Sequence, residues 1–113
     1  MKSIQIKKYG GSDVVEVNKT ASVPSISSGK ILVNIKASGV NPSDWKIREG
    51  YFQQMAPLQF PSTLGGDFSG IVKQIGEADD LSSDFKQGDE VYGYISVLSG
   101  GSGAFAELAL ANK

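Results

Sequence analysis

The sequence of 113 residues contains no cysteine and no histidine. Without cysteine, the chain cannot form disulfides, thiolate nucleophiles or cysteine-based zinc sites. Without histidine, it lacks the commonest general base and a frequent metal ligand. We therefore expect no metal, and any catalysis must depend on carboxylates, amines, tyrosines or a bound cofactor.

Long apolar runs and a strong excess of charge are also missing. No apolar stretch approaches the roughly 20 residues that a membrane-spanning helix needs, and none follows the basic Lys2, Lys7 and Lys8 as it would in a signal peptide. A net charge of −1 gives no electrostatic footprint for nucleic acid. The composition therefore predicts a cytoplasmic protein with neither a membrane nor a nucleic acid as its partner.

What is present favours one mainly β domain over residues 1–113. Fourteen glycines accompany short segments in which apolar and polar residues alternate. The predicted strands are Ser3–Lys8, Val14–Lys19, Lys30–Ala37, Asp67–Ile75, Glu90–Leu98 and Ala104–Ala111. The last of these is equally compatible with the start of a helix. Five or six strands at such spacings indicate a barrel or a sandwich.

Irregular segments are predicted between these strands. They are a loop at Ala21–Lys30, an irregular stretch at Tyr51–Thr63 and an acidic loop at Glu77–Gln87. The acidic loop lacks the spacing of a calcium-binding EF-hand, so we interpret it as solvated. Within the strand Asp67–Ile75, Gly70 indicates a bulge or a close approach of another backbone.

A short helix at Pro42–Glu49 directly follows the strand Lys30–Ala37. Asn41 suits the N-cap position and Pro42 the first helical position, and Gly50 supplies the stop because glycine enters the left-handed region at little cost. This turn and helix concentrate polar and aromatic residues at the end of a strand. They are Asn41, Asp44, Trp45, Lys46 and Arg48.

Several of these residues have an ordinary structural alternative. Trp45, with Tyr51 and Phe52, forms either a wall for a flat ligand or part of the core, and the pattern does not separate the two. Asp44 and Arg48 have the spacing of a surface ion pair. On composition alone, Lys46 is more often a solvated lysine than a ligand contact.

The glycine-rich loop Gly100–Gly103 raises the hypothesis of a phosphate-binding site. A P-loop needs Lys-Ser/Thr opening a helix after the glycines, and a dinucleotide fingerprint needs a βαβ unit. Neither follows this loop, so a flexible or close-packed hairpin loop is the favoured interpretation.

Four blocks of sequence, in this order, resemble the medium-chain dehydrogenases/reductases. They are Gly39–Lys46, Leu64–Val72, Lys86–Gly93 and Gly103–Glu107. The chain looks most like the quinone oxidoreductase branch, close to the alkenal and enone reductases. The resemblance implies a GroES-like, partly open β-barrel with one or two short helices.

The resemblance also implies chemistry. Zinc members of the family have a cysteine at the position of Asn41 and a His-Glu pair at Gly66-Asp67, so this chain looks like a zinc-independent member. The implied reaction is hydride transfer from NADPH to a quinone or an enone. The lysine matching Lys46 contacts cofactor and substrate in the enone reductases, which makes Lys46 the expected catalytic residue. Asn41 and Asp44 match positions beside the cofactor, and Trp45 and Tyr51 are expected to bind the planar substrate.

The Rossmann domain that binds NADPH in this family has no counterpart in these 113 residues. We therefore predict a portion of a longer enzyme that neither binds NADPH tightly nor turns over alone. The alternative is a free-standing β-barrel interaction module that lost the chemistry. A surface left open by a missing domain would also favour a homodimer.

Overall fold

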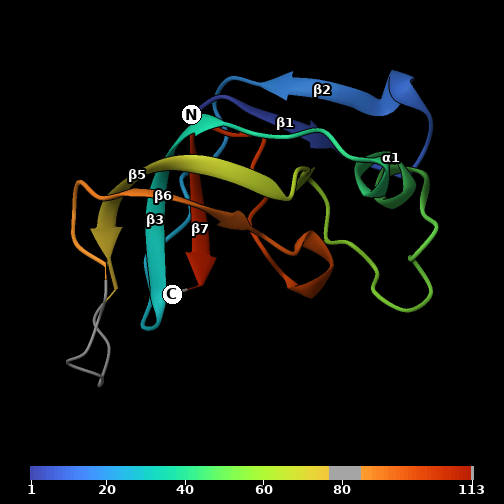
Figure 1. Cartoon of the computed structure of the whole chain (residues 1–113). Helices are drawn as coiled ribbons and strands as arrows, with labels where there is room; N and C mark the ends of the chain where they lie inside the picture. Colours follow the sequence, from blue (N-terminus) through green and yellow to red (C-terminus); the bar gives the residue numbers. More distant parts are fainter. Residues whose placement is uncertain (77–84, 113) are drawn as a thin grey trace.

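The computed structural model describes residues 1–76 and 85–112 as two antiparallel sheets and one α-helix (Figure 1). The strands are β1 (Ser3–Ile6), β2 (Val15–Asn18), β3 (Lys30–Ala37), β4 (Ser62–Thr63), β5 (Asp67–Ile75), β6 (Glu90–Tyr94) and β7 (Leu108–Asn112). The helix α1 spans Pro42–Glu49, and two 3-10 turns, η1 (Ser12–Val14) and η2 (Val97–Ser99), complete the elements. None of the helices in this part of the chain combines the length and the apolar character needed to cross a membrane.

The two sheets form a partly open barrel. The small sheet has the order β2-β1-β4 and the large sheet the order β6-β5-β3-β7. A bridge between Ser3 and Ala106 joins the two sheets, and the Ile4 N–H donates to the Phe105 carbonyl at 2.8 Å. The predicted mainly β, partly open architecture with a short helix is confirmed.

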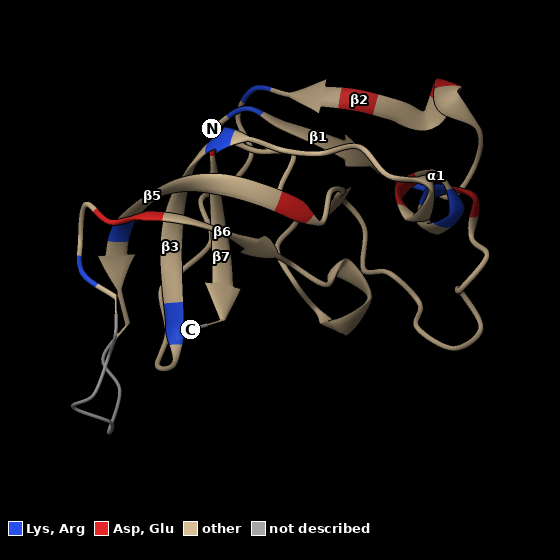
Figure 2. Ribbon diagram, viewed as in Figure 1, with Lys and Arg blue, Asp and Glu red and all other residues tan. Residues whose placement is uncertain are grey.

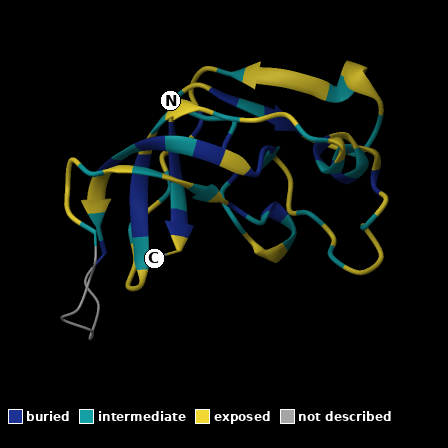
Figure 3. Ribbon diagram, viewed as in Figure 1, coloured by how far each residue is buried: buried dark blue, intermediate teal, exposed yellow. Residues whose placement is uncertain are grey.

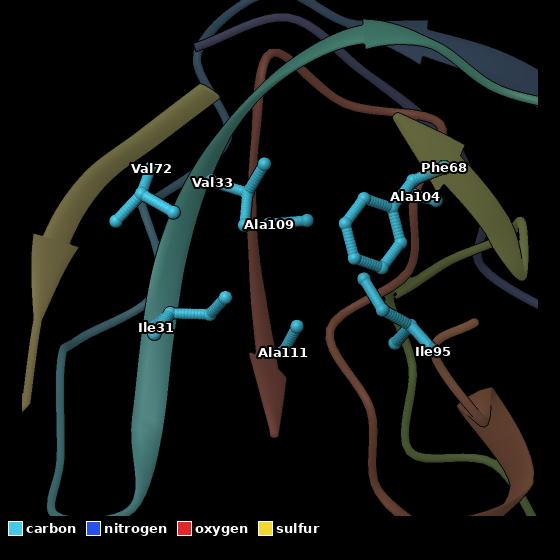
Figure 4. Packing of buried hydrophobic residues seen from close by; sticks show 8 residues of the cluster. All are labelled: Ile31, Val33, Phe68, Val72, Ile95, Ala104, Ala109 and Ala111. Atoms are coloured by element: carbon cyan, nitrogen blue, oxygen red, sulfur yellow. The ribbon is translucent and has the colours of Figure 1, made fainter. Parts of the chain in front are cut away.

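The main core lies on the inner face of the large sheet. Strand β3 contributes Ile31 and Val33 to this core, and Leu32 between them is also buried, whereas Asn34 is exposed. Figure 3 shows much of β3 as buried. Figure 4 shows the buried members of this cluster, which are Ile31, Val33, Phe68, Val72, Ile95, Ala104, Ala109 and Ala111. Residues far apart in the sequence therefore share one apolar layer.

A second, smaller cluster fixes α1 against the small sheet. Ile6 of β1, Ile47 of α1 and Leu64 are its buried members, and Ile6 is fully buried. Half-buried apolar side chains surround them, namely Val14, Phe52, Leu58, Leu98 and Phe105. The position of α1 therefore depends on Ile47, the only apolar residue of the helix besides Trp45.

Three predicted elements have the expected bounds. They are β3, α1 and β5. The prediction for Gly70 is also confirmed, because the β3–β5 register shifts between Ile35 and Ala37, and a Cβ at Gly70 would lie 2.2 Å from the Asn34 carbonyl oxygen. The backbone of β3 thus passes too close for any side chain at position 70.

Six strand ends differ from the predictions. Two of them are C-terminal ends that differ by one residue, because β2 ends at Asn18 rather than Lys19 and β7 at Asn112 rather than Ala111. β1 ends at Ile6 rather than Lys8, and β2 begins at Val15 because Val14 belongs to η1. β6 ends at Tyr94 rather than Leu98, because the Ile95 N–H leaves the ladder and donates to the Gly66 carbonyl at 2.8 Å. β7 begins at Leu108 rather than Ala104, and its pairing with β3 shows that the helical alternative for this segment was wrong.

The remaining differences concern surface and loop segments. Val15 and Val17 of β2 are both exposed, because β2 is an edge strand that pairs only with β1. The irregular stretch Tyr51–Thr63 ends in the short strand β4, which brings the described strands to seven. Most of the predicted acidic loop, at 77–84, lies outside the described residues. Within the described ranges, no group of three or more His, Cys, Asp or Glu residues could hold a metal ion.

Candidate functional site

The N-terminus of α1 is fixed by Asn41 and Asp44. Asn41 has the extended backbone of an N-cap, and its N–H donates to the Asp44 Oδ2 at 2.7 Å. Asp44 is 8% exposed, so its carboxylate serves the helix start from a buried position. Gly50 ends the helix with φ of 88° and ψ of 21°, the left-handed conformation expected of it.

The C-terminal part of α1 is tied to the turn after β1. The Arg48 Nε donates to the Gly10 carbonyl at 3.2 Å, and the Gly10 N–H donates to the Arg48 carbonyl at 3.1 Å. Arg48 also pairs with Glu49 at 3.1 Å. The predicted ion pair between Asp44 and Arg48 is therefore wrong, because each side chain is engaged elsewhere.

A hydrogen bond joins the start of α1 to the start of β5. The Asn41 Nδ2 donates to the Asp67 Oδ2 at 2.7 Å. Both residues begin their elements, Asn41 as the helix cap and Asp67 as the first residue of the strand. Figure 2 shows the acidic start of β5 and the mixed charges of α1. We call this contact the Asn41–Asp67 bridge.

A cation and two aromatic rings gather on α1 and the turn after it. The Lys46 Nζ lies 5.7 Å from the Trp45 ring centroid, within the range of a cation–π contact. Trp45 and Tyr51 pack edge to face, with centroids 5.3 Å apart at an interplanar angle of 83°. Trp45 is 38% exposed and Tyr51 62% exposed, so these two are not core residues, whereas Phe52 packs against the smaller core cluster.

The five predicted site residues thus form two neighbouring groups in the described structure. Asn41 and Asp44 organise the helix start, and Trp45, Lys46 and Tyr51 form an exposed aromatic and cationic surface. Val40, directly before Asn41, is 82% exposed and borders an apolar hollow of about 510 Å³. None of the five predicted site residues lines this hollow, and Asp44 is buried, so their binding roles stay predictions.

Two residues of this face were missed by the sequence interpretation. Asp67 was noted only in the Gly66-Asp67 pair and as the first residue of a strand, and Tyr94 only as part of the predicted strand Glu90–Leu98. The register of β5 and β6 pairs Asp67 with Tyr94, which brings residues 27 positions apart side by side. The available signal was the alternation of Tyr92 and Tyr94, and it did not specify the partner strand.

The glycine-rich loop before β7 is close-packed at Gly101 and Gly103, whereas Gly100 has open space beside it. A Cβ at Gly103 would lie 2.3 Å from the Thr63 carbonyl oxygen, and a Cβ at Gly101 would lie 2.5 Å from the Ile95 side chain. These contacts agree with the favoured interpretation of a packed loop over a phosphate cradle.

Comparison with known proteins identifies relatives of this architecture. Residues 27–113 match the family model described as the alcohol dehydrogenase GroES-like domain. The chain is 40% identical to a quinone oxidoreductase of Sus scrofa over 111 residues, which cover 98% of the chain and 31% of the relative. It is 37% identical to an NADPH-dependent alkenal/one oxidoreductase of Arabidopsis thaliana over 97 residues, which cover 85% of the chain and 24% of the relative.

The fold also matches a crystal structure of an Escherichia coli quinone oxidoreductase complexed with NADPH. The TM-score is 0.78 at 27% identity, and the match covers 99% of this chain and 31% of that protein. The chain thus spans about a third of the length of the curated relatives that it matches over nearly all its residues.

Proposed function

Because this chain belongs to the alcohol dehydrogenase GroES-like domain family, within the medium-chain dehydrogenases/reductases that include the quinone oxidoreductases, we propose that it is the substrate-side domain of an NADPH-dependent oxidoreductase. The acceptor is a quinone or an α,β-unsaturated carbonyl. The observation that carries the proposal is the Lys46 ammonium beside the exposed Trp45–Tyr51 pair. An exposed aromatic pair with a cation over the Trp45 ring suits a planar acceptor that becomes negatively charged.

Lys46 is the proposed catalytic residue. A quinone or enone that accepts hydride develops negative charge on its oxygen, and a nearby cation stabilises that charge most strongly where water is excluded. The Lys46 side chain is half-buried and lies against Trp45, which restricts its position. Trp45 and Tyr51 are the proposed contacts for the ring of the acceptor.

In this proposal, the cofactor is NADPH, and this domain supplies only some of its contacts. Lys46 offers a cation, and Asn41 and Asp44 would line the cofactor side of the cleft at the helix start. Bound NADPH supplies the hydride. The name of the Arabidopsis relative and the NADPH complex of the Escherichia coli protein support this cofactor.

Zinc does not fit this face, and we propose a zinc-independent reaction. Asn41 uses its amide nitrogen to donate to Asp67, and Gly66 offers no side chain. In the described ranges, no cluster of three His, Cys, Asp or Glu residues is available as a ligand set. In this proposal, Lys46 provides the positive charge that a metal would otherwise supply.

A second domain, of the Rossmann type, is the proposed partner for this face. Large apolar side chains at or beside the site are exposed, namely Val40, Trp45, Tyr51 and Tyr94. Such a surface favours burial against another domain or another copy, so the homodimer also stays a prediction. The cytoplasm remains our prediction for location.

The proposal predicts that the 113-residue chain alone does not bind NADPH in the micromolar range. Contacts from Lys46 and Asn41 alone are too few for tight NADPH binding. The glycine-rich nucleotide fingerprint that holds the pyrophosphate in this family is absent from the 113 residues. Isothermal titration calorimetry of the chain with NADPH is the measurement. The full-length product of the same reading frame is the positive control, and it is expected to bind.

Micromolar binding of NADPH by the chain alone would contradict the proposal that a second domain supplies most of the contacts to NADPH. Failure of the full-length product to bind NADPH would contradict the proposed function itself and would favour an interaction module.

A further inference from the structure

The ring of Tyr94 occupies the space that a side chain at Gly66 would need. A Cβ built at Gly66 would lie 2.2 Å from the Tyr94 Cε2, 2.9 Å from its Cδ2 and 3.0 Å from its Cζ. Real Cβ atoms essentially never approach other atoms as closely as the first two of these distances, so a larger residue at position 66 would displace the Tyr94 ring from this position. The Tyr94 ring thus packs against the backbone of Gly66.

Tyr94 also lies beside the Asn41–Asp67 bridge. Tyr94 and Asp67 are directly opposite in the β5–β6 register, so their side chains project from the same face of the sheet. Asp67 in turn accepts the hydrogen bond from Asn41. Tyr94 is therefore the cross-strand neighbour of the residue that accepts the hydrogen bond from the start of α1.

The strand end next to Tyr94 is anchored, whereas the Tyr94 side chain is exposed. The next residue, Ile95, is 4% exposed and its N–H donates to the Gly66 carbonyl at 2.8 Å, which anchors the strand end below the ring. Tyr94 itself remains 59% exposed. Because the Tyr94 ring is largely exposed, it contributes little to the hydrophobic core. Its exposed surface is available for contact with a ligand.

We propose that Tyr94 is a contact residue for the planar carbonyl acceptor, with its ring packing against the acceptor and its hydroxyl available to donate to an acceptor oxygen. This inference rests on the proposed function and extends it to β6. Tyr92 is the natural control, because it lies on the same face two residues earlier, opposite Ser69, and is 88% exposed.

The test is a titration of the ¹⁵N-labelled 113-residue chain with tetramethyl-1,4-benzoquinone, followed by amide chemical shifts without NADPH. All ring positions of this quinone are substituted, so it does not add to lysine amines. We expect the amide signals of Gly66, Asp67 and Tyr94 to shift. Shifts that avoid these three residues, or no shifts up to the solubility limit of the quinone, would overturn the inference without any variant.

Two matched variants sharpen the result. Tyr94→Leu keeps apolar bulk but removes the flat ring and hydroxyl, and we expect it to weaken quinone binding roughly threefold to tenfold. Tyr92→Leu is expected to leave the affinity unchanged. Equal effects of the two substitutions would overturn the inference, and Tyr94→Phe separates the ring contact from the hydroxyl.

The experiments distinguish failure of the Tyr94 inference from failure of the proposed function. The titration involves neither NADPH nor turnover, so its failure removes Tyr94 from the site and leaves the oxidoreductase proposal standing. If the quinone binds at Tyr94 but the full-length protein does not oxidise NADPH, the binding site is supported and the proposed reaction is contradicted.

Discussion

Lys46→Ala in the full-length protein should lower kcat/KM for quinone or enone reduction by about 10²-fold to 10³-fold. Loss of one preorganised group that stabilises a developing oxyanion has an effect of this size. The Lys46 ammonium lies 5.7 Å from the Trp45 ring centroid, so its removal leaves the proposed acceptor wall without its cation. The measurement is the steady-state rate of NADPH oxidation over a range of acceptor concentrations.

Two further variants make the Lys46 result specific. Lys46→Arg keeps the positive charge and should retain more activity than Lys46→Ala. Lys7→Ala removes an exposed lysine that pairs with Glu16 at 3.4 Å on the small sheet, and it should leave kcat/KM unchanged. Full activity of Lys46→Ala would remove Lys46 from the mechanism.

Gly70→Ala should lower the free energy of unfolding by at least about 3 kcal/mol. The new Cβ would lie 2.2 Å from the Asn34 carbonyl oxygen and 2.7 Å from a Val33 methyl group. Because the first of these atoms belongs to the backbone of β3, relief requires the β3–β5 ladder to move. For a domain of this size, such a loss is a large fraction of the total stability.

Urea denaturation measures this loss, with the fluorescence of the single tryptophan, Trp45, as the probe. Gly11→Ala is the control, since Gly11 lies in an exposed turn with φ of −76°, where alanine is tolerated. Its expected effect is within about 0.5 kcal/mol. A stability of Gly70→Ala equal to that of the parent chain would show that the close approach of β3 and β5 is wrong.

The elements that the sequence predicted with correct bounds are those defined by local signals. Its apolar residues Ile31, Val33 and Ile35 at every second position indicate β3, while the cap residues Asn41, Pro42 and Gly50 specify both ends of α1. These signals act within a few residues, so they are visible without the fold. The aromatic and cationic residues of α1 were identified for the same reason, since they are contiguous.

The strand ends that were predicted wrongly depend on distant partners. β6 stops at Tyr94 because Ile95 bonds to Gly66, and residues 104–107 leave regular structure while the Phe105 carbonyl accepts from Ile4. The exposure of Val17 follows from the edge position of β2, which no local pattern reports. Tertiary hydrogen bonds and sheet order decided each of these cases.

The part of the candidate site that the sequence could not provide is the part built across strands. Asp67 meets Asn41 through a loop-to-strand contact, and Tyr94 meets Asp67 through the β5–β6 register. The relation between Tyr94 and Gly66 is likewise steric, because the ring lies where a Cβ would stand. Sequence spacing contains none of this information.

The most direct test of the central claim is NADPH oxidation by the full-length protein with a panel of quinones and enones. We predict acceptor-dependent oxidation that proceeds in the presence of a chelator, because the proposed site uses Lys46 and no zinc. An absence of acceptor-dependent oxidation across the panel, or a complete loss of activity on chelation, would contradict the account.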